Sequence, residues 1–170
     1  MMRKKAYRSQ YAVLPIAVRN GEFSVMLVTS RETHRWILPK GWPEKGLTPA
    51  ATATKEAYEE AGLMGEVETT PYGHFHYDKR LRTGEIVPCE VDVFLMRVDR
   101  ELEDWPERSQ RKRRWVSPAQ AADMIQESDL AQLLRRLTHH GALTEAGPRT
   151  RKQGAGRARA YPRSAAAKPA

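Results

Sequence analysis

The stretch that most constrains the fold runs from Gly41 to Leu63 and reads GWPEKGLTPAATATKEAYEEAGL. Its glycines and prolines make the first part typical of a loop. Thr48 is predicted to cap a helix that starts at Pro49, because a threonine hydroxyl accepts from free N–H groups of the first turn and proline needs no partner there. The following residues favour a helix up to Gly62, which predicts its end. The rest of the chain must fold around this loop and helix.

Three glutamates occupy the last turns of the predicted helix. At 3.6 residues per turn, Glu56 lies beside both Glu59 and Glu60. Like charges at this spacing destabilise a helix unless cations bind them, and carboxylate oxygens suit Mg²⁺ or Mn²⁺. An exposed acidic face is the alternative interpretation. The glycine-rich loop favours a metal site, because backbone N–H groups in such a loop can face phosphate oxygens.

The same stretch resembles the Nudix box, G-x5-E-x7-R-E-U-x-E-E-x-G-U, in which U is a bulky aliphatic residue. The positions that match are Gly41, Glu56, Glu59, Glu60, Gly62 and Leu63, with Ala57 as a small version of the first U. Leu47 stands where the motif has its first glutamate, and Lys55 stands where it has arginine. In the family these two side chains brace the loop against the helix by ionic contacts. Lysine keeps the charge of arginine without its bidentate fork, so the resemblance implies a variant brace.

The resemblance to the Nudix family implies a hydrolase of phosphoanhydride bonds that uses Mg²⁺, with Mn²⁺ as the alternative cation. A metal ion assists such a reaction by polarising phosphoryl oxygens and lowering the pKa of a bound water. By motif position, the implied metal ligands are Glu56, Glu59 and Glu60, and the implied catalytic residues are Glu56 and Glu60. Glu56 is either a ligand or the general base. A base from a later loop is the alternative, with Glu85, Glu90, Glu103 and Glu107 as candidates.

Basic residues around the loop indicate a substrate with many phosphates. The segments RWILPKG and RKRRW are similar to those of Nudix enzymes that hydrolyse diphosphoinositol polyphosphates and diadenosine polyphosphates, in which basic residues near these segments bind phosphates. The predicted phosphate-binding residues are Arg35, Lys40, Gly41, Arg111 and Arg113. These relatives often carry a triple glycine where this chain has Lys40-Gly41-Trp42, and Trp42 is expected either to stack on a ring of the substrate or to shield the loop.

The remaining patterns predict an α+β fold. Asn20-Gly21 is a strong hairpin signal between two apolar strands, and Pro15 in the first of them suggests an edge strand or a bulge. Further strands are expected within 65–77, 86–98 and 110–116. One helix is expected from Ser117 to about residue 127. A second, capped by Ser128 or Asp129, is expected to reach Leu137 with a stripe of leucines along one face. This order suits an α+β sandwich, and the resemblance implies a Nudix-type α/β/α sandwich with a mixed β-sheet.

Three segments are predicted: a basic lead-in over 1–9, a Nudix domain over 10–140 and a basic tail over 141–170. The net charge of +8 lies mainly in the tail, because seven basic residues and no acidic ones follow residue 145. The tail is rich in glycine, proline, alanine and arginine and is predicted to be disordered. A solvated tail is the favoured interpretation, and an arm that holds RNA or DNA is the alternative.

No apolar run is long enough to span a bilayer, and the first ten residues lack the apolar segment of a secretory signal. Cys89 is the only cysteine, which excludes an internal disulfide. We therefore expect a cytoplasmic enzyme with a small anionic phosphorylated substrate and no membrane partner; the oligomeric state is left open. The alternatives are a Nudix pyrophosphohydrolase for nucleoside triphosphates or RNA 5′ ends, and a weakly active Nudix-fold module that binds polyanions.

Overall fold

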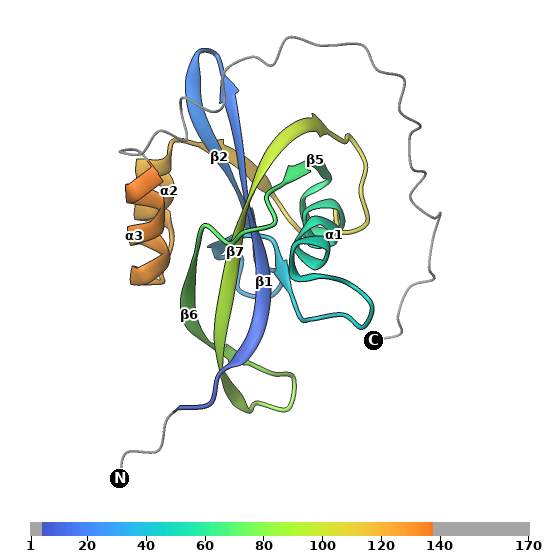
Figure 1. Cartoon of the computed structure of the whole chain (residues 1–170), viewed down its shortest axis with the longest axis vertical. Coiled ribbons are helices and arrows are strands. Elements are labelled where there is room, and N and C mark those ends of the chain that lie inside the picture. Colours follow the sequence, from blue (N-terminus) through green and yellow to red (C-terminus); the bar gives the residue numbers. More distant parts are fainter. Residues whose placement is uncertain (1–4, 138–170) are drawn as a thin grey trace.

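The structure, a computed structural model, describes residues 5–137. In this part of the chain, one eight-stranded mixed sheet has helix α1 on one face and helices α2 and α3 on the other (Figure 1). The predicted α+β sandwich with a mixed sheet is therefore confirmed. The predicted tail over 141–170 lies outside the described residues. The elements are β1 (Arg8–Arg19), β2 (Glu22–Thr29), β3 (Trp36–Ile37), β4 (Lys40–Gly41), α1 (Pro49–Ala61), β5 (Leu63–Val67), β6 (Gly73–Arg80), β7 (Ile86–Glu101), β8 (Arg113–Val116), α2 (Pro118–Met124) and α3 (Ser128–Leu137).

Strand β1 is central, so the expectation that Pro15 marks an edge or a bulge is wrong. On one side β1 pairs in parallel with β7, with Pro15 opposite Met96. On the other side it pairs with β4 up to Ala12 and with β2 from Ile16 onward. The Val13 N–H points to this second side, where it donates to Pro39 O (3.0 Å), and the nitrogen of Pro15 has the same orientation. Its missing N–H falls between β4 and β2 and removes no ladder bond.

Strand β7 organises the other half of the sheet. It pairs with β1 along one edge, and its opposite edge pairs first with β6 and then with β5. The segment 65–77, expected to hold one or two strands, thus contributes to two. The Asn20-Gly21 hairpin is confirmed, with φ values of 50° and 76° that suit a two-residue turn between β1 and β2.

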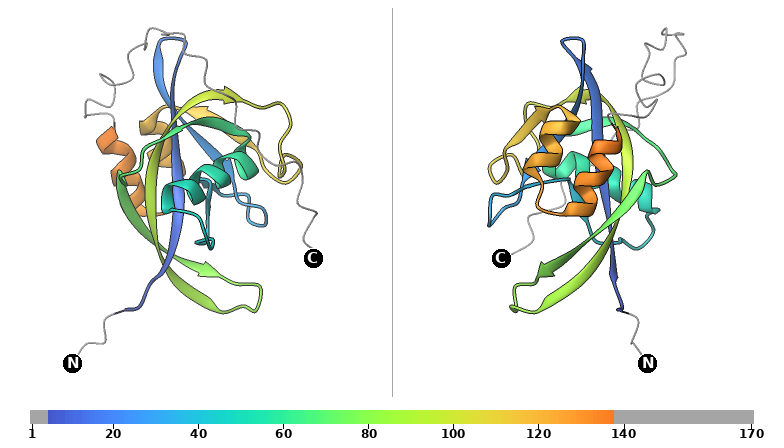
Figure 2. Two further views of the ribbon diagram at one scale, coloured as in Figure 1. Left: turned by 45° about the vertical axis from the view of Figure 1, so that its right-hand side comes forward. Right: turned by 90° about the vertical axis from the view of Figure 1, so that its left-hand side faces the viewer.

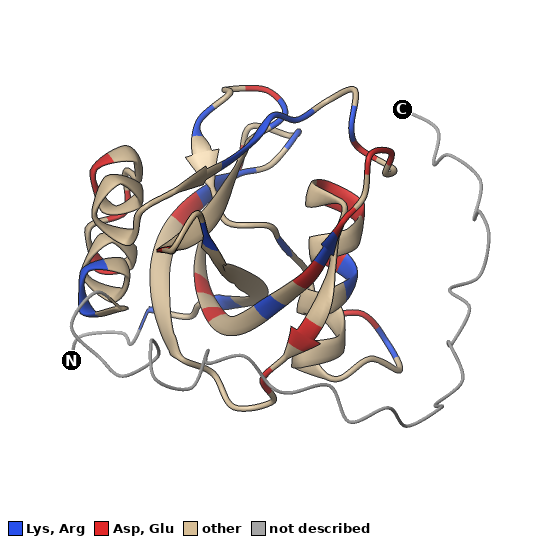
Figure 3. Cartoon of the chain, turned by 90° about the horizontal axis from the view of Figure 1, so that it is seen from above, with Lys and Arg blue, Asp and Glu red and all other residues tan. Residues whose placement is uncertain are grey.

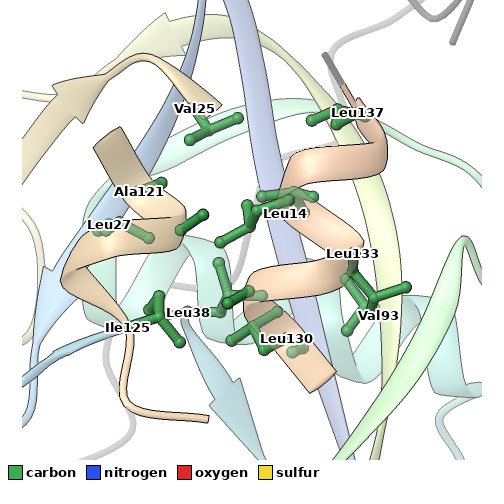
Figure 4. Close-up of a cluster of buried hydrophobic side chains, with 14 of the residues drawn as sticks. Leu14, Val25, Leu27, Leu38, Val93, Ala121, Ile125, Leu130, Leu133 and Leu137 are labelled. Atoms are coloured by element: carbon green, nitrogen blue, oxygen red, sulfur yellow. The ribbon is translucent and has the colours of Figure 1, made fainter. Parts of the chain in front are cut away.

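The two faces of the sheet carry separate cores. Helices α2 and α3 lie side by side over one face, where the predicted leucine stripe of α3 packs on the sheet (Figures 2 and 4). Against the other face, α1 buries Ala53, Ala57 and Ala61 next to Phe94 and Met96. Small side chains let this helix lie close to the sheet, which explains why alanine suits residue 57. Within the described range, no helix has the length and apolar character needed to cross a membrane.

Candidate active site

The C-terminal half of α1 carries the three glutamates and lies against β4. Thr48 caps the helix by accepting a hydrogen bond from the Ala51 N–H (3.1 Å), and Gly62 ends it in the left-handed region, with φ of 63°. Both predicted helix ends are thereby confirmed. A side chain at residue 41 would overlap the Glu56 carboxylate, so only glycine allows this approach. The loop therefore approaches the helix closely where Gly41 lies against the Glu56 side chain.

Glu60 is the most buried of the three carboxylates. Arg111 Nη2 donates to its Oε1 (3.0 Å), and the Lys40 backbone N–H donates to its Oε2 (3.3 Å). Burial raises the pKa of Glu60 to about 7, against the opposing charges of Arg111 and Lys40. Arg111 also donates to Glu107 (3.3 Å) and to Thr29 O (3.0 Å). One guanidinium thus links the helix, the loop before β8 and strand β2.

Glu56 is the carboxylate with the greatest resistance to ionisation. Burial raises its pKa to about 8, and the negative charges of Glu60 and Glu59 contribute to the shift. Among residues 5–137, no group forms a hydrogen bond or ion pair with its side-chain carboxylate. Glu59, in contrast, lies 3.6 Å from Lys55 Nζ. Of the three glutamates, Glu56 is the one whose oxygens are left for a water molecule or a ligand.

The loop is braced by an ion pair that the motif does not contain. Lys55 Nζ donates to both carboxylate oxygens of Glu44, at 2.7 and 2.9 Å. This contact raises the pKa of Lys55. Leu47, at the motif position of the missing glutamate, is exposed. Glu44 therefore takes the place of the motif glutamate, three residues before its usual position at 47, and pairs with Lys55.

The donor set of α1 fits a divalent cation. Within the described range, the oxygens of the three glutamates are not gathered within 4.8 Å of one another, since Glu60 and Glu59 each hold a separate cationic partner. The charge repulsion that raises the pKa of Glu56 is the kind that a bound cation relieves. Carboxylate oxygens from one helix match the preference of Mg²⁺ and Mn²⁺ for hard ligands. Glu56, Glu59 and Glu60 are the residues that would hold the ion.

Three of the five predicted phosphate-binding residues lie at these glutamates: Lys40, Gly41 and Arg111. Arg35 instead bonds to the connection between α2 and α3. Its Nη1 donates to Gln126 Oε1 (2.8 Å) and to Glu127 Oε1 (3.1 Å). A role of Arg35 in phosphate binding stays a prediction, and it requires that a substrate compete with these two acceptors.

Arg113 holds the C-terminal end of α1. Its guanidinium donates to Ala61 O and to Leu102 O, both at 2.7 Å, and stacks over the Trp105 ring at 4.0 Å. Trp105 Nε1 in turn donates to Glu60 O (3.1 Å). These contacts favour a structural role, and phosphate binding by Arg113 stays a prediction.

A group of cations and aromatic rings, here called the basic basin, lies beside Lys40. It comprises Arg8, Lys40, Lys79, Trp42 and Tyr77. The Arg8 guanidinium lies 4.3 Å from the Trp42 ring centre and Lys79 Nζ lies 5.8 Å from it, whereas Lys40 Nζ lies 5.0 Å from the Tyr77 ring. Burial lowers the pKa of Lys40 to about 8. In the described part of the chain, none of the three cations has a carboxylate in ion-pair contact, so the basin attracts anions.

Sequence reasoning missed Glu44 and Arg8. Glu44 had a signal, because it is the carboxylate nearest to Leu47 in the same loop. Arg8 had none, since only the pairing of β1 with β4 and β7 brings it to Trp42. Figure 3 shows acidic positions on α1, which lies on the opposite side of the sheet from α2 and α3.

Comparisons with known proteins agree with this geometry. The family model of the NUDIX domain matches residues 8–139 of this chain. Nudix hydrolase 12, mitochondrial, of Arabidopsis thaliana is 35% identical over 106 residues, which cover 61% of this chain and 52% of that protein. Diphosphoinositol polyphosphate phosphohydrolase 3-alpha of Mus musculus is 36% identical over 110 residues, 62% of each chain. The crystal structure of the C. elegans Ap4A hydrolase superposes with a TM-score of 0.56 and 16% identity, over 79% of this chain and 98% of that one.

This chain spans about half the length of the Arabidopsis relative. The match to the NUDIX domain nevertheless extends from the first residue of β1 to beyond the end of α3. It includes the loop, the glutamates of α1 and the strands that position them. The chain therefore belongs to the Nudix domain family.

Proposed function

We propose that this protein is a Mg²⁺-dependent hydrolase that cleaves phosphoanhydride bonds in highly phosphorylated small molecules, of the diphosphoinositol polyphosphate or diadenosine polyphosphate class. The observation that carries the proposal is the contact between two oppositely charged regions. The glutamates of α1 adjoin the basic basin at Lys40, whose backbone N–H donates to Glu60 and whose ammonium belongs to the basin. A metal-binding helix thus lies next to cations that have no carboxylate of their own.

The roles of the side chains follow from their contacts. Glu56, the unbonded carboxylate, acts in its ionised form and takes a proton from the attacking water at one of its oxygens. The water oxygen bonds to phosphorus, and the bridging oxygen leaves with the electrons of the broken P–O bond. Arg111 and the Lys40 N–H hold Glu60 in place. Glu56, Glu59 and Glu60 would hold a divalent cation, which would polarise the phosphoryl oxygens and lower the pKa of a bound water.

The basic basin supports the choice of substrate. Three cations without ion-pair partners offer more positive charge than a single diphosphate needs, and each further phosphate gains a charge-assisted contact. The mouse relative, which is 36% identical, is named as a diphosphoinositol polyphosphate phosphohydrolase, and this name supports the same class. The rings of Trp42 and Tyr77 contact its cations and so help to hold them in position.

The proposed chemistry is tested by replacing Glu56 with the isosteric glutamine. Removal of a general base that is also a metal ligand is expected to lower kcat by about 10³-fold. Glu103→Gln is the matched control, because Glu103 is an exposed glutamate of the loop before β8 and one of the alternative bases. Equal losses in the two variants, or full activity of Glu56→Gln, would show that the role of Glu56 is assigned wrongly.

The substrate class is tested with Mg²⁺ and a panel of five compounds: diphosphoinositol pentakisphosphate, diadenosine hexaphosphate, ADP-ribose, a nucleoside triphosphate and 5′-triphosphate RNA. We expect the highest kcat/KM on one of the first two. Lys79→Ala should raise KM for that compound by about 10-fold with little change in kcat, as expected for the loss of one charged phosphate contact. Arg100→Ala is the control and should leave KM unchanged, because Arg100 is an exposed arginine near the C-terminal end of β7.

Each other result has a definite meaning. Preferred turnover of the nucleoside triphosphate or the RNA would keep the chemistry and reject the substrate class. Binding of polyphosphates without turnover of any compound would identify a binding module rather than an enzyme. A KM that rises equally in Lys79→Ala and Arg100→Ala would show that general charge, and not the basin, attracts the substrate.

A further inference from the structure

Two histidines and a glutamate form a cluster on β6 and β7 that the proposed reaction does not use. His74 and His76 alternate with the buried Phe75, so they share one face of β6. Glu90 of β7 pairs directly with His76 in the antiparallel register. One ring nitrogen from each histidine and a carboxylate oxygen of Glu90 all lie within 4.8 Å of one another. The sheet therefore presents three metal-ligating atoms at one place.

The orientation of the His76 ring is fixed by Asp129, in the first turn of α3. Asp129 Oδ2 accepts from the His76 backbone N–H (2.8 Å) and lies 3.3 Å from its Nδ1. Nε2 of the same ring donates to Glu90 Oε2 (2.8 Å) in the metal-free protein, so a metal ion bound here would replace that proton between the two atoms. A carboxylate that holds the far nitrogen of a histidine is the usual support of a metal-binding imidazole.

The surroundings of the cluster favour a cation. Asp92 pairs with His74 in the same register, so Glu90, Asp92 and Asp129 place three carboxylates around two imidazoles. The ligand atoms of a tetrahedral zinc site lie roughly 3.4 Å apart, given metal–ligand bonds of about 2.0–2.1 Å. The present spacing reaches this value by small side-chain rotations, because both histidines stand on the same strand and Glu90 already contacts His76.

We propose that His74, His76 and Glu90 form a second metal site, one that binds Zn²⁺ and is separate in chemistry from the glutamates of α1. Two imidazoles and one carboxylate suit Zn²⁺, whereas Mg²⁺ prefers oxygen ligands alone. Asp129 acts as a positioning residue through His76. Within residues 5–137, β6 pairs with β7 alone. The bound ion would join β6 to β7 and, through Asp129, to α3. With a water molecule as its fourth ligand, the ion would act as a clasp between these elements.

The test is a calorimetric titration of the full chain with Zn²⁺ in excess Mg²⁺, which occupies the all-oxygen site of α1. Wild type is expected to bind one Zn²⁺ per chain at this site, and Zn²⁺ should raise its thermal unfolding midpoint. His74→Gln and His76→Gln should each weaken binding by at least 10-fold and abolish the thermal shift. Asp129→Asn should weaken it by about 10-fold. Titration with Co²⁺ adds a spectroscopic readout, since tetrahedral Co²⁺ absorbs visible light far more strongly than octahedral Co²⁺.

The other three histidines of the chain supply the controls. His34→Asn keeps the left-handed backbone at residue 34, where φ is 52°, because asparagine tolerates this region. A double variant, His139→Gln with His140→Gln, removes the remaining two. Both controls should bind Zn²⁺ as wild type does.

The result that overturns the proposal is wild-type affinity in His74→Gln and His76→Gln, or a loss of equal size in either control. His74 is exposed, so His74→Gln is expected to fold, and its metal-free unfolding midpoint should match that of wild type. If His76→Gln fails to fold, His74→Gln alone decides, because both ligands must be present for the site to form.

Discussion

At the scale of single residues, Glu56 shows how a site for a cation costs stability when no cation is bound. Its pKa in the folded protein is about 8, against an ordinary value of 4.5, chiefly because of burial and the nearby charges of Glu60 and Glu59. Above pH 4.5 the unfolded chain loses this proton readily, whereas the folded protein retains it. The unfolded state therefore binds fewer protons, and the free energy of unfolding falls as the pH rises.

We predict that the metal-free protein loses stability between about pH 4.5 and pH 8 and that Glu56→Gln removes part of this loss. The contribution of Glu56 is fully present below pH 4.5 and is lost once the pH has passed about 8. At pH 8 the variant should be more stable than wild type by about 1–3 kcal/mol, since each pKa unit corresponds to about 1.4 kcal/mol and solvent screens part of the shift.

Urea unfolding with a chelator, at several pH values for both proteins, measures this difference. Mg²⁺ at pH 8 should restore the stability of wild type and have less effect on Glu56→Gln. Parallel pH profiles of the two proteins, with no gain for the variant at pH 8, would contradict the assigned cause of the shift.

Arg113 allows a structural contact to be separated from a phosphate contact. Arg113→Ala leaves the carbonyls of Ala61 and Leu102 without their donor, and we predict a loss of about 1–3 kcal/mol in the free energy of unfolding. KM for a polyphosphate should stay near that of wild type. Arg114→Ala, an exposed neighbour in β8, is the control and should change neither quantity. A KM that rises by 10-fold or more at unchanged stability would instead establish Arg113 as a phosphate ligand.

At the scale of elements, the Lys55–Glu44 ion pair matters for the position of the loop beside α1 more than for stability. Lys55 and Glu44 are each 40% exposed, and ion pairs of this kind contribute only about 0–1 kcal/mol to stability. Their contact nevertheless holds the loop that presents Gly41 to Glu56. Since a small displacement of a catalytic group lowers the rate strongly, the effect of the brace should appear in kcat rather than in stability.

We predict that Glu44→Gln lowers kcat by about 10-fold while the free energy of unfolding changes by less than about 1 kcal/mol. Adding Leu47→Glu to this variant should recover activity, because a carboxylate returns to the motif position opposite Lys55. Kinetics and thermal unfolding of wild type, the single variant and the double variant decide the matter. A single variant with wild-type kcat would show that the loop keeps its position without the pair.

Elements whose rules are local could be predicted from the sequence, and elements that depend on distant partners could not. The caps of α1 and the Asn20-Gly21 turn follow from neighbouring residues, and the structure has both. The central position of β1 depends on its pairing with β7, more than seventy residues away along the chain. Pro15 alone therefore led to the wrong expectation that β1 is an edge strand or contains a bulge. The basic strand expected over 110–116 begins only at Arg113. Just before it, Arg111 forms an ion pair with Glu60, a distant contact that no local pattern reveals.

At the scale of the whole molecule, the sheet assembles the site from distant segments. The parallel pairing of β1 with β7 places Arg8 opposite Cys89, and the pairing of β1 with β4 places the loop beside them. The motif predicts that the three glutamates lie close together, because they belong to one helix. It does not predict the basic basin, whose members come from β1, β4, the residue after β4, and β6, and meet only in the folded sheet. Substrate preference is therefore the part of the function that the sequence defines least.

The distribution of charge along the chain leads to a prediction for the basic tail. Residues 1–145 carry about +1 of the net charge of +8, so the high charge belongs to residues 146–170, outside the described residues. The glutamates and the basic basin all lie within 5–137. Deletion of 146–170 should therefore leave kcat/KM on a small polyphosphate within about 2-fold of wild type, because the residues assigned to the site all stay in place.

Binding to single-stranded RNA provides the contrast. If the tail holds nucleic acid, its deletion should weaken RNA binding and flatten the dependence of affinity on salt, since fewer phosphates are neutralised. Fluorescence anisotropy at several salt concentrations measures both quantities. Equal RNA affinity and equal salt dependence before and after deletion would assign any RNA binding to the basic basin of the folded domain. Activity on small substrates that falls with the deletion would show instead that the tail takes part in the reaction.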